Sequence, residues 1–284
     1  MAAVLLDGRP IAAAIREDVK VRAAALRSRG VTPTCAIVLL ENDEPGRLYA
    51  NQIARASSGV GITVEIRELP AQATTDQVLA AVGAVVDDSH VHAMMVQRPL
   101  PAHLDAARIS EEIDPRKDVD GAHPYNQGLL MAGEHFFVPA TAAAVMELLQ
   151  QPQLSSLDGA RAVVLGRSAV VGRPVALLLI AANATVTICH SHTKDLARVS
   201  REGDIVVAAV GHPRFVTAEM VRPGATVIDV GTNWVGGHFV GDVDAQSVAP
   251  VAGALSPVPG GVGPVTTAVL LRSIVEATER SAPT

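Results

Sequence analysis

The stretch that decides the fold runs from Val163 to Pro174 and reads V-V-L-G-R-S-A-V-V-G-R-P. Its apolar run ends at Gly166, and a helix is predicted to begin near Gly172, with Pro174 in the first turn. A strand, a glycine-containing turn and a helix N-terminus bring several unpaired backbone N–H groups to one point, which suits a phosphate. Because Gly-x-Ser-x-x-x-Gly departs from the usual Gly-x-Gly-x-x-Gly, an ordinary strand-to-helix turn remains the alternative.

The next strand-like run favours a particular nucleotide. Ala184–Cys189 ends about twenty residues further on, where a dinucleotide-binding fold places the residue that contacts the ribose. An NAD site would carry Asp or Glu there, to accept from the 2′-hydroxyl. This chain has His190, Ser191 and His192 at that point, and Arg167 stands in the preceding turn. Cations and hydroxyl donors without a carboxylate suit a 2′-phosphate, so NADP is favoured over NAD; solvated loop histidines are the alternative.

Composition narrows the class of protein. With 284 residues, of which 49% are hydrophobic, the chain is long enough for two domains with substantial cores. The net charge of −6 and the aromatic content of 2% argue against a nucleic-acid partner, since such proteins use basic faces and stacking rings. The longest helical apolar run, Val175–Ala182, is too short to cross a membrane.

The two cysteines and the first residues bear on the compartment. Cys35 and Cys189 lie in apolar strand-like runs, which is typical of buried free thiols in a reducing compartment. The start, M-A-A-V-L-L-D-G-R-P, lacks the charged region and apolar core of a signal peptide. We therefore expect a cytoplasmic protein with no membrane partner.

Helical and strand-like patterns alternate along the chain, which predicts parallel βαβ units. The predicted helices are Pro10–Arg29, Leu48–Ser58, Thr74–Asp87, Thr141–Gln150, one from about Gly172, and a last one to about Arg280. The predicted strands are Cys35–Leu40, Ile62–Leu69, Val91–Gln97, Ala162–Leu165, Ala184–Cys189, Ile205–Ala209 and Thr226–Val230. The fold class is therefore α/β with two domains, a parallel-sheet catalytic domain and a Rossmann-type dinucleotide-binding domain. We expect the active site in the cleft between them.

Two further segments have the composition of ligand-binding loops. Asp114–Gly121 reads D-P-R-K-D-V-D-G and continues as a polar stretch to Asn126. Its carboxylates Asp118 and Asp120 can accept from the paired N–H donors of a polar heterocycle; a solvated charged turn is the alternative. Ser256–Thr267, S-P-V-P-G-G-V-G-P-V-T-T, combines glycines that allow close approach with prolines that stiffen the loop, unless it is a plain linker.

These segments together resemble the methylenetetrahydrofolate dehydrogenase/cyclohydrolase family. The resemblance runs through L-D-G-R-P, V-Q-R-P-L-P-A-H-L, D-P-R-K-D-V-D-G-A-H-P, V-V-L-G-R-S-A-V-V-G-R-P, D-V-G-T-N and P-V-P-G-G-V-G-P-V-T, and covers almost the whole chain. It implies a cytoplasmic homodimeric oxidoreductase of one-carbon metabolism that acts on a tetrahydrofolate derivative, with NADP as cofactor and NAD as the alternative. The family moves hydride from the methylene bridge to NADP, then hydrolyses the methenyl product to the formyl form. It implies a catalytic domain at 1–140, completed by the helix 265–284, and an NAD(P)-binding domain at 141–264.

The resemblance also implies residue roles and no metal site. Tyr49 would stack on the aminobenzoyl group, Gln97 would be the polar group near the reacting carbon, and Asp120 would anchor the pterin; these three are the implied catalytic residues. The other implied substrate-binding residues are Arg98, Leu100, Pro259, Gly260, Gly261 and Thr266. Of these, Gly260, Gly261 and Thr266 would close over both the folate and the cofactor. The implied cofactor-binding residues are Gly166, Arg167 and Ser168, which would hold the phosphates, together with Gly172 and Arg173. Ser191 would lie near the 2′-phosphate, and Thr232 would lie on the nicotinamide side.

The chain departs from the family pattern at Ile53. The family has a lysine four residues after the tyrosine, on the same helix face, and this chain reads Tyr49-Ala50-Asn51-Gln52-Ile53. Hydride transfer depends mainly on proximity and on the lone pairs of the folate nitrogens, whereas hydrolysis needs an activated water and a proton shuttle. We therefore expect dehydrogenase activity to survive and cyclohydrolase activity to be weak or lost.

A second departure is Arg98, where the family usually has an apolar residue. Three interpretations stay open: a positive charge near the vacated lysine position, a group that holds a carboxylate or phosphate of a different substrate, or a side chain turned to solvent. Even in the first of these interpretations, the guanidinium would not replace the lysine in hydrolysis, because it cannot shuttle protons near neutral pH. At the level of function, the alternatives to the dehydrogenase are an enzyme of the same fold with another substrate and a non-catalytic folate- or nucleotide-binding paralogue.

Overall fold

The computed structural model describes residues 3–282 and divides into two compact units, each with its own parallel sheet. The six-stranded unit comprises the described residues up to Ala13, Leu130–Glu134 and Pro139–Thr266. The three-stranded unit comprises Ala14–Leu129, His135–Val138 and the described residues from Thr267 on. Helices α1 (Arg9–Ser28), α5 (Pro124–Met131) and α10 (Val262–Ser281) each contain residues of both units.

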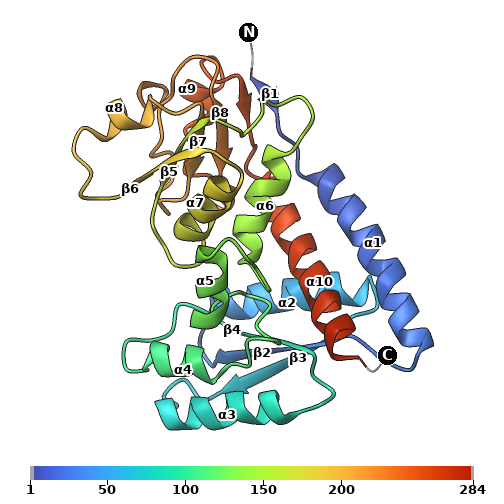
Figure 1. Ribbon diagram of the computed structural model, residues 1–284. Coiled ribbons are helices and arrows are strands. Elements are labelled where there is room, and N and C mark those ends of the chain that lie inside the picture. The colour runs from blue at the N-terminus through green and yellow to red at the C-terminus, as the bar shows by residue number, and fades with distance from the viewer. Residues whose placement is uncertain (1–2, 283–284) are drawn as a thin grey trace. The chain divides into compact units, whose positions relative to one another are not determined.

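The three-stranded unit is built on β2, whose side chains are all buried. Its strands are β2 (Thr34–Leu40), β3 (Thr63–Leu69) and β4 (Ala93–Val96), in the order β3-β2-β4 and all parallel. Figure 1 shows α2 (Glu44–Ser58) on one face of this sheet and α3 (Thr75–Asp87) with α4 (Ala106–Glu112) on the other. A continuous apolar strand of Cys, Ala, Ile, Val and Leu is what a parallel sheet covered on both faces requires.

The six-stranded unit has the doubly wound arrangement of a Rossmann domain. Its parallel sheet has the order β1-β11-β8-β7-β5-β6, formed by β1 (Val4–Leu5), β11 (Ala254–Leu255), β8 (Thr226–Asp229), β7 (Ile205–Ala208), β5 (Arg161–Leu165) and β6 (Thr185–Cys189). Its further elements are α6 (Ala140–Leu149), α7 (Gly172–Ala181), α8 (Leu196–Ser200), the short helix η1 (Ala218–Met220), the antiparallel pair β9 (Asn233–Val235) and β10 (His238–Val240), and α9 (Ala245–Val248). α7 packs on β5 and β6 and against α6 (Figure 1).

The predicted fold class is confirmed, and every predicted strand forms within two residues of its expected limits. The prediction was wrong where helices begin inside expected loops. Asp114–Asn126 is not a loop throughout, because α5 begins at Pro124, a residue well suited to the first helical position. Likewise Ser256–Thr267 is not a loop throughout, because helix α10 begins at Val262. α5, with eight residues, is too short to show a clear periodic pattern of its own.

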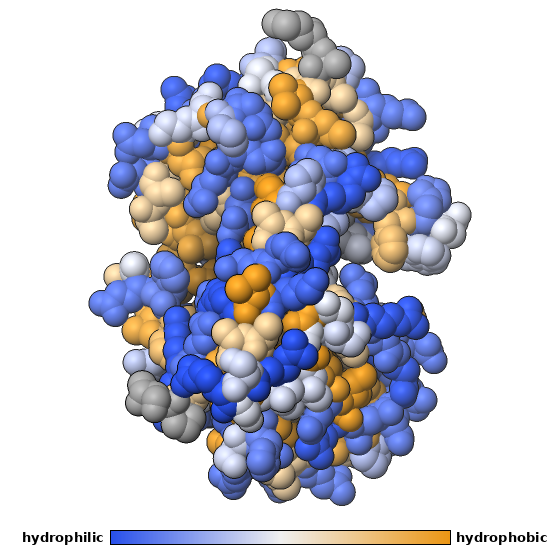
Figure 2. Space-filling model, turned by 90° about the vertical axis from the view of Figure 1, so that its right-hand side faces the viewer, coloured by the Kyte–Doolittle hydropathy of each residue, from blue (hydrophilic) through white to orange (hydrophobic). Residues whose placement is uncertain are grey.

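Both thiols are buried and free, as predicted. On the face shown in Figure 2, hydrophilic residues are interspersed with smaller hydrophobic patches. Within residues 3–282, every helix is too short or too polar to span a bilayer.

Candidate functional site

In the six-stranded unit, the turn after β5 can be built only with glycine at two positions. Gly166 has φ +116°, and a Cβ atom on it would overlap the carbonyl oxygen of Ala209. A Cβ atom on Gly172 would overlap the carbonyl oxygen of Gly166, because the start of α7 passes directly over the turn. The hydroxyl of Ser168 accepts from the N–H of Gly172 at 3.3 Å. The turn is thus tightly specified although its sequence differs from the common pattern.

The same turn leaves a run of backbone donors without acceptors. Within the described part of the chain, the N–H groups of residues 167–171 donate no hydrogen bond, and Arg167, Ser168 and Arg173 are exposed. Adjacent unpaired N–H groups at a helix N-terminus, together with exposed guanidinium groups, fit the phosphates of a dinucleotide. The ordinary-turn interpretation leaves these donors unexplained.

The loop after β6 lies beside this turn. Leu165 pairs with Cys189, and the N–H of Gly166 donates to the carbonyl of Cys189 at 2.9 Å. His190 is half-buried, and its backbone N–H donates a hydrogen bond to Thr193 Oγ1. Ser191 is exposed. The structure therefore brings Gly166 and its neighbours next to the segment predicted to receive the 2′-phosphate.

Two other predicted segments of this unit are held by backbone contacts. Thr232 is exposed just after β8, where the buried carboxylate of Asp229 accepts from Gly231, Asp242 and Val243 N–H groups. Burial raises the pKa of Asp229 to about 6, although the hydrogen bonds from these N–H groups act to lower it. The structure thus explains Asp229 as a buried anchor of the D-V-G-T-N segment.

The glycine- and proline-rich loop is fixed as well. Gly260 has φ +113° and its carbonyl accepts from Gly8 N–H at 2.9 Å, while Gly261 N–H donates to Pro257 at 2.7 Å. Pro259 is exposed at the tip. Thr266, buried, uses its hydroxyl to donate to Val262 within α10.

In the three-stranded unit, α2 carries two predicted positions, Tyr49 and Ile53, along one side of the helix. Asp43 caps its first turn by accepting from Gly46 N–H at 3.0 Å. Gly46 packs closely on Gln97, whose Cγ would be 2.6 Å from a Cβ atom on that glycine. Tyr49 follows one turn later and is half-buried, and Ile53 follows another turn later with 0% of its side chain exposed. The position for which the resemblance implies a lysine is therefore filled by an apolar side chain in the core.

The two loop carboxylates, two residues apart, have different surroundings. Asp118 is fully buried and accepts from Ala122 N–H, His123 N–H and the Asn126 side-chain amide, at 3.1, 2.8 and 2.8 Å. It fixes the turn that leads into α5. Asp120, within the described residues, accepts no hydrogen bond. The carboxylate that remains for a ligand is Asp120.

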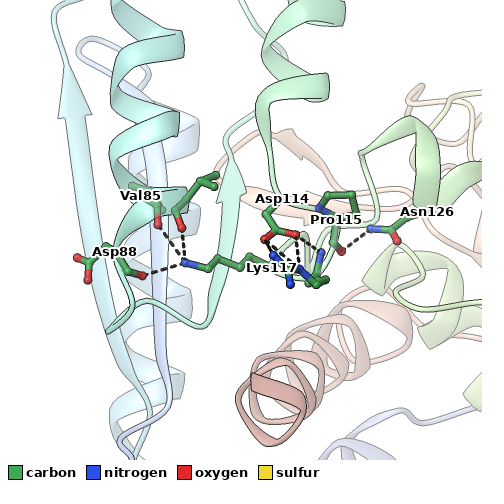
Figure 3. Close-up of polar contacts among 8 residues, drawn as sticks. Val85, Asp88, Asp114, Pro115, Lys117 and Asn126 are labelled. Atoms are coloured by element: carbon green, nitrogen blue, oxygen red, sulfur yellow. Dashed lines mark hydrogen bonds and ion pairs between the residues drawn. The ribbon is translucent and has the colours of Figure 1, made fainter. Parts of the chain in front are cut away.

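The ammonium group of Lys117 is hydrogen-bonded at the end of α3, as Figure 3 shows. Its ammonium donates to the carbonyl groups of Val85, Val86 and Asp88 at 3.3, 2.7 and 2.8 Å, at the C-terminal end of α3. Unpaired carbonyls at a helix C-terminus favour such a cation. Although it is close in sequence to Asp118 and Asp120, Lys117 serves as a helix cap.

Burial sets the protonation states near Asp120. Burial and then the charge of Asp118 raise the pKa of Asp120 to about 7, while Arg98 acts to lower it. Burial and the charge of Asp120 raise the pKa values of Tyr49 and Cys35 to about 12. Near neutral pH the tyrosine and the cysteine therefore stay protonated, and Asp120 is the group that titrates.

Gln97 and Arg98 follow β4 directly. Gln97 donates from Nε2 to the carbonyl of Arg98 at 3.1 Å, and its Oε1 is buried without a donor. Arg98 donates from Nη2 to the hydroxyl of Ser110 at 2.5 Å, and its Nε is buried without an acceptor. The interpretation that Arg98 turns to solvent is wrong. Sequence reasoning missed Ser110, because its position on the short helix α4 gave no recognisable pattern.

A cavity of about 310 Å³ lies at the ends of β2 and β4. Gln97 and Leu100 line it together with Leu40, Asp43 and Pro101. Tyr49, Ile53 and Asp120 are not among its lining residues. Gln97 therefore packs against α2 at Gly46, and it lines the same cavity as Leu100.

A doubly wound parallel sheet with a glycine turn under a helix N-terminus defines a dinucleotide-binding protein, here with a second α/β unit that carries buried titratable groups. The family description "Tetrahydrofolate dehydrogenase/cyclohydrolase, catalytic domain" matches residues 6–120, and its "NAD(P)-binding domain" matches residues 139–282. The chain therefore belongs to the tetrahydrofolate dehydrogenase/cyclohydrolase family.

Curated proteins and solved structures agree with the family. The bifunctional protein FolD of Parafrankia sp. is 54% identical over 96% of this chain and 98% of that protein. The structure of the bifunctional enzyme FolD from Campylobacter jejuni is 38% identical, with a TM-score of 0.95 and coverage of 99% of this chain and 100% of that one. The Trypanosoma brucei FolD structure, described as complexed with NADP cofactor and inhibitor, is 37% identical, with a TM-score of 0.94 and complete coverage of both chains.

Proposed function

We propose that this protein is a methylenetetrahydrofolate dehydrogenase in which the cyclohydrolase step is weak or lost. It oxidises methylenetetrahydrofolate to methenyltetrahydrofolate with NADP, as its family membership implies. The observation that carries the second half of the proposal is Ile53, an apolar side chain with 0% exposure where the resemblance implies a lysine.

The residues of the six-stranded unit fit the dinucleotide. A turn in which Cβ atoms at Gly166 and Gly172 would overlap backbone lets the phosphates approach the free N–H groups of residues 167–171. Arg167 and Ser191 are both exposed, and a guanidinium and a hydroxyl suit the 2′-phosphate. When bound, NADP supplies the hydride acceptor. We further propose that Ser168, Arg173 and Thr232 contact it.

Hydride transfer does not require a proton shuttle from the protein. The folate nitrogens that flank the methylene carbon supply the electron pairs, and the protein contributes proximity and orientation. We propose that Tyr49 stacks on the aminobenzoyl group, that Gln97 lies near the reacting carbon, and that Asp120 anchors the pterin. Arg98, Leu100, Pro259, Gly260, Gly261 and Thr266 complete the proposed substrate-binding set.

Hydrolysis has no suitable acid or base at the lysine position. Ile53 has no proton to exchange, and Tyr49 stays protonated because its pKa is about 12. Asp120, with a pKa of about 7, is engaged with the pterin in this proposal. Loss of one well-placed acid/base group typically lowers a rate by about 10²–10⁴-fold.

The test is to assay the two activities separately on the purified protein. We expect NADP reduction with methylenetetrahydrofolate, and methenyl hydrolysis slower than the dehydrogenase step by about 10²-fold or more. Equal rates would refute the loss of hydrolysis. Tight folate binding without NADP reduction would instead identify a non-catalytic paralogue, and absence of folate binding would indicate another substrate.

We also propose a cytoplasmic homodimer with a catalytic domain at 1–140 and 265–284 and an NAD(P)-binding domain at 141–264. The buried free thiols of Cys35 and Cys189 are consistent with a reducing compartment. Light scattering after size-exclusion chromatography tests the dimer, cell fractionation tests the compartment, and limited proteolysis tests the domain limits. A monomeric mass would contradict the first.

A further inference from the structure

The L-D-G-R-P motif, Leu6–Pro10, has no part in the proposed function, and the structure places it along the glycine- and proline-rich loop. β1 pairs in parallel with β11, and directly after β1 the N–H of Leu6 donates to the carbonyl of Leu255 at 2.9 Å. Two residues later, the N–H of Gly8 donates to the carbonyl of Gly260 at 2.9 Å. The N-terminal segment therefore holds the loop where it leaves β11 and again near its tip.

Gly8 lies so close to the loop that no side chain fits between them. A Cβ atom on Gly8 would be 2.0 Å from the carbonyl oxygen of Gly261 and 2.7 Å from Cγ2 of Val265 in α10. The φ angle of Gly8 is outside the left-handed region, so close approach, and not backbone strain, is what requires glycine here. The substitution Gly8→Ala therefore perturbs this contact without straining the backbone of residue 8.

Both sides of the contact are backbone held by further hydrogen bonds. On the loop side, the N–H of Gly261 donates to the carbonyl of Pro257 at 2.7 Å, and a Cβ atom on Gly261 would be 2.6 Å from the same oxygen. On the other side, the carbonyl of Gly8 accepts from the N–H of Ala12 at 2.9 Å, in the first turn of α1. The N-terminal segment is thus anchored to a long helix, and the loop rests against it.

We propose that Gly8 is a positioning residue that fixes Gly260 and Gly261 for binding of the folate. The inference rests on the proposed function, in which these two glycines belong to the substrate-binding set, and it adds a residue that acts through them. A Cβ atom 2.0 Å from the Gly261 oxygen has to displace the loop by about 1 Å, and a displacement of this size costs up to about 10²-fold in kcat/KM.

The first test needs no folate. Hydrogen–deuterium exchange is followed by mass spectrometry on peptides that cover residues 256–263, in ligand-free wild type and Gly8→Ala. Exchange in this loop is expected to be about tenfold faster in Gly8→Ala, because the hydrogen bonds that hold it are displaced, and to be unchanged in β5 and β7. Equal acceleration along the whole chain would indicate a general loss of stability and would overturn the inference.

The matched control is a glycine at which alanine fits. A Cβ atom on Gly59, the C-cap of α2, meets its nearest neighbour at 3.5 Å, which is ordinary contact, and the φ angle of this residue is −66°. Gly59→Ala is expected to leave the loop exchange and the kinetic constants at their wild-type values.

The second test separates positioning from stability by steady-state kinetics. In Gly8→Ala, the KM for methylenetetrahydrofolate is expected to rise about tenfold or more, because the displaced loop binds the folate less well. A protein that is only destabilised contains less active enzyme, which lowers the apparent kcat and leaves KM unchanged. A lower kcat with an unchanged KM would therefore overturn the inference.

A second variant covers the case in which Gly8→Ala does not fold. Val265→Ala removes the methyl group that a Cβ atom on Gly8 would meet and leaves the overlap with the Gly261 oxygen. The double variant Gly8→Ala/Val265→Ala thus keeps the contact under test in a less crowded setting. Compared with Val265→Ala alone, it is expected to show the same rise in KM and the same faster loop exchange, and equal values in the two would overturn the inference.

The outcomes for the two proposals are distinct. Faster loop exchange in Gly8→Ala, in a protein without folate turnover, would refute the proposed function and support the coupling of Gly8 to the loop. Unchanged loop exchange together with an unchanged KM would refute the coupling, whatever the activity. Faster loop exchange with an unchanged KM in an active enzyme would show that the position of the loop does not affect folate binding, and would also overturn the inference.

Discussion

The turn after β5 and the end of β4 make their electrostatic environments in different ways. At the turn, the donors are backbone N–H groups of residues 167–171, which the fold itself holds in place. In the three-stranded unit, which contains the end of β4, the environment depends on a few side chains, chiefly Asp120, Arg98 and Ile53. A site made of backbone tolerates exchange of most side chains as long as its glycines stay. A site made of side chains can lose one reaction step through a single substitution.

The largest expected effect tests the side-chain site. Ile53→Lys is expected to raise methenyl hydrolysis by about 10²-fold or more, because it supplies the missing proton carrier. The reaction is followed by the decay of methenyl absorbance. Ile53→Met, which keeps an uncharged chain of similar length, is the matched control and should leave hydrolysis at the wild-type rate. If the lysine variant folds and hydrolysis does not increase, other residues of the pocket limit this step.

The next effect tests the backbone site. Gly172→Ala is expected to weaken NADP binding by about tenfold or more, since relief of the overlap with Gly166 must move the turn. Gly128, in α5, has nothing within 4 Å of its Cβ direction, so Gly128→Ala is the control and should bind NADP normally. Calorimetric titration measures both. Unchanged affinity in Gly172→Ala would show that the turn is less constrained than its geometry indicates.

A smaller effect concerns the choice of nucleotide. Arg167→Gln is expected to reduce the preference for NADP over NAD by about tenfold, because a charged contact to a phosphate is worth about 1.5–3 kcal/mol. The ratio of kcat/KM for the two nucleotides is the measurement. Arg201→Gln, an exposed arginine at the end of α8, serves as control. An unchanged ratio would assign the discrimination to His190–His192.

A further effect is on stability and leaves both activities aside. The pKa of Asp120 rises on folding from 3.8 to about 7, so between these values the folded protein holds a proton that the unfolded chain has released. The free energy of unfolding therefore falls as the pH rises through this window. Asp120→Asn is expected to be more stable than the wild type by about 4 kcal/mol near pH 8 and by less than about 1 kcal/mol near pH 4. Denaturant titrations at both pH values check this, and an equal difference at the two would contradict it.

The sequence predicts the strands of both sheets because continuous apolar runs and glycine turns are local signals. It identifies Gly166 and Gly172, whose constraint is local as well. It does not reveal that Asp118 anchors a turn while Asp120 is free, since both stand in one acidic motif and their difference arises from Asn126 and two backbone N–H groups. It also misses that Lys117 caps α3 and that Ser110 holds Arg98, because these partners are distant in the chain.

In this protein we propose that hydride transfer is much faster than enzymatic hydrolysis of the methenyl product. It is tested most directly by one progress curve with methylenetetrahydrofolate and NADP, in which reduced nicotinamide and methenyl absorbance are recorded together against an enzyme-free blank. We expect one methenyl group to accumulate for each NADPH formed and then to decay at, or only slightly above, the rate of the blank. If methenyl does not accumulate, because the enzyme converts it to the formyl form as fast as it is made, the proposed loss of hydrolysis is wrong.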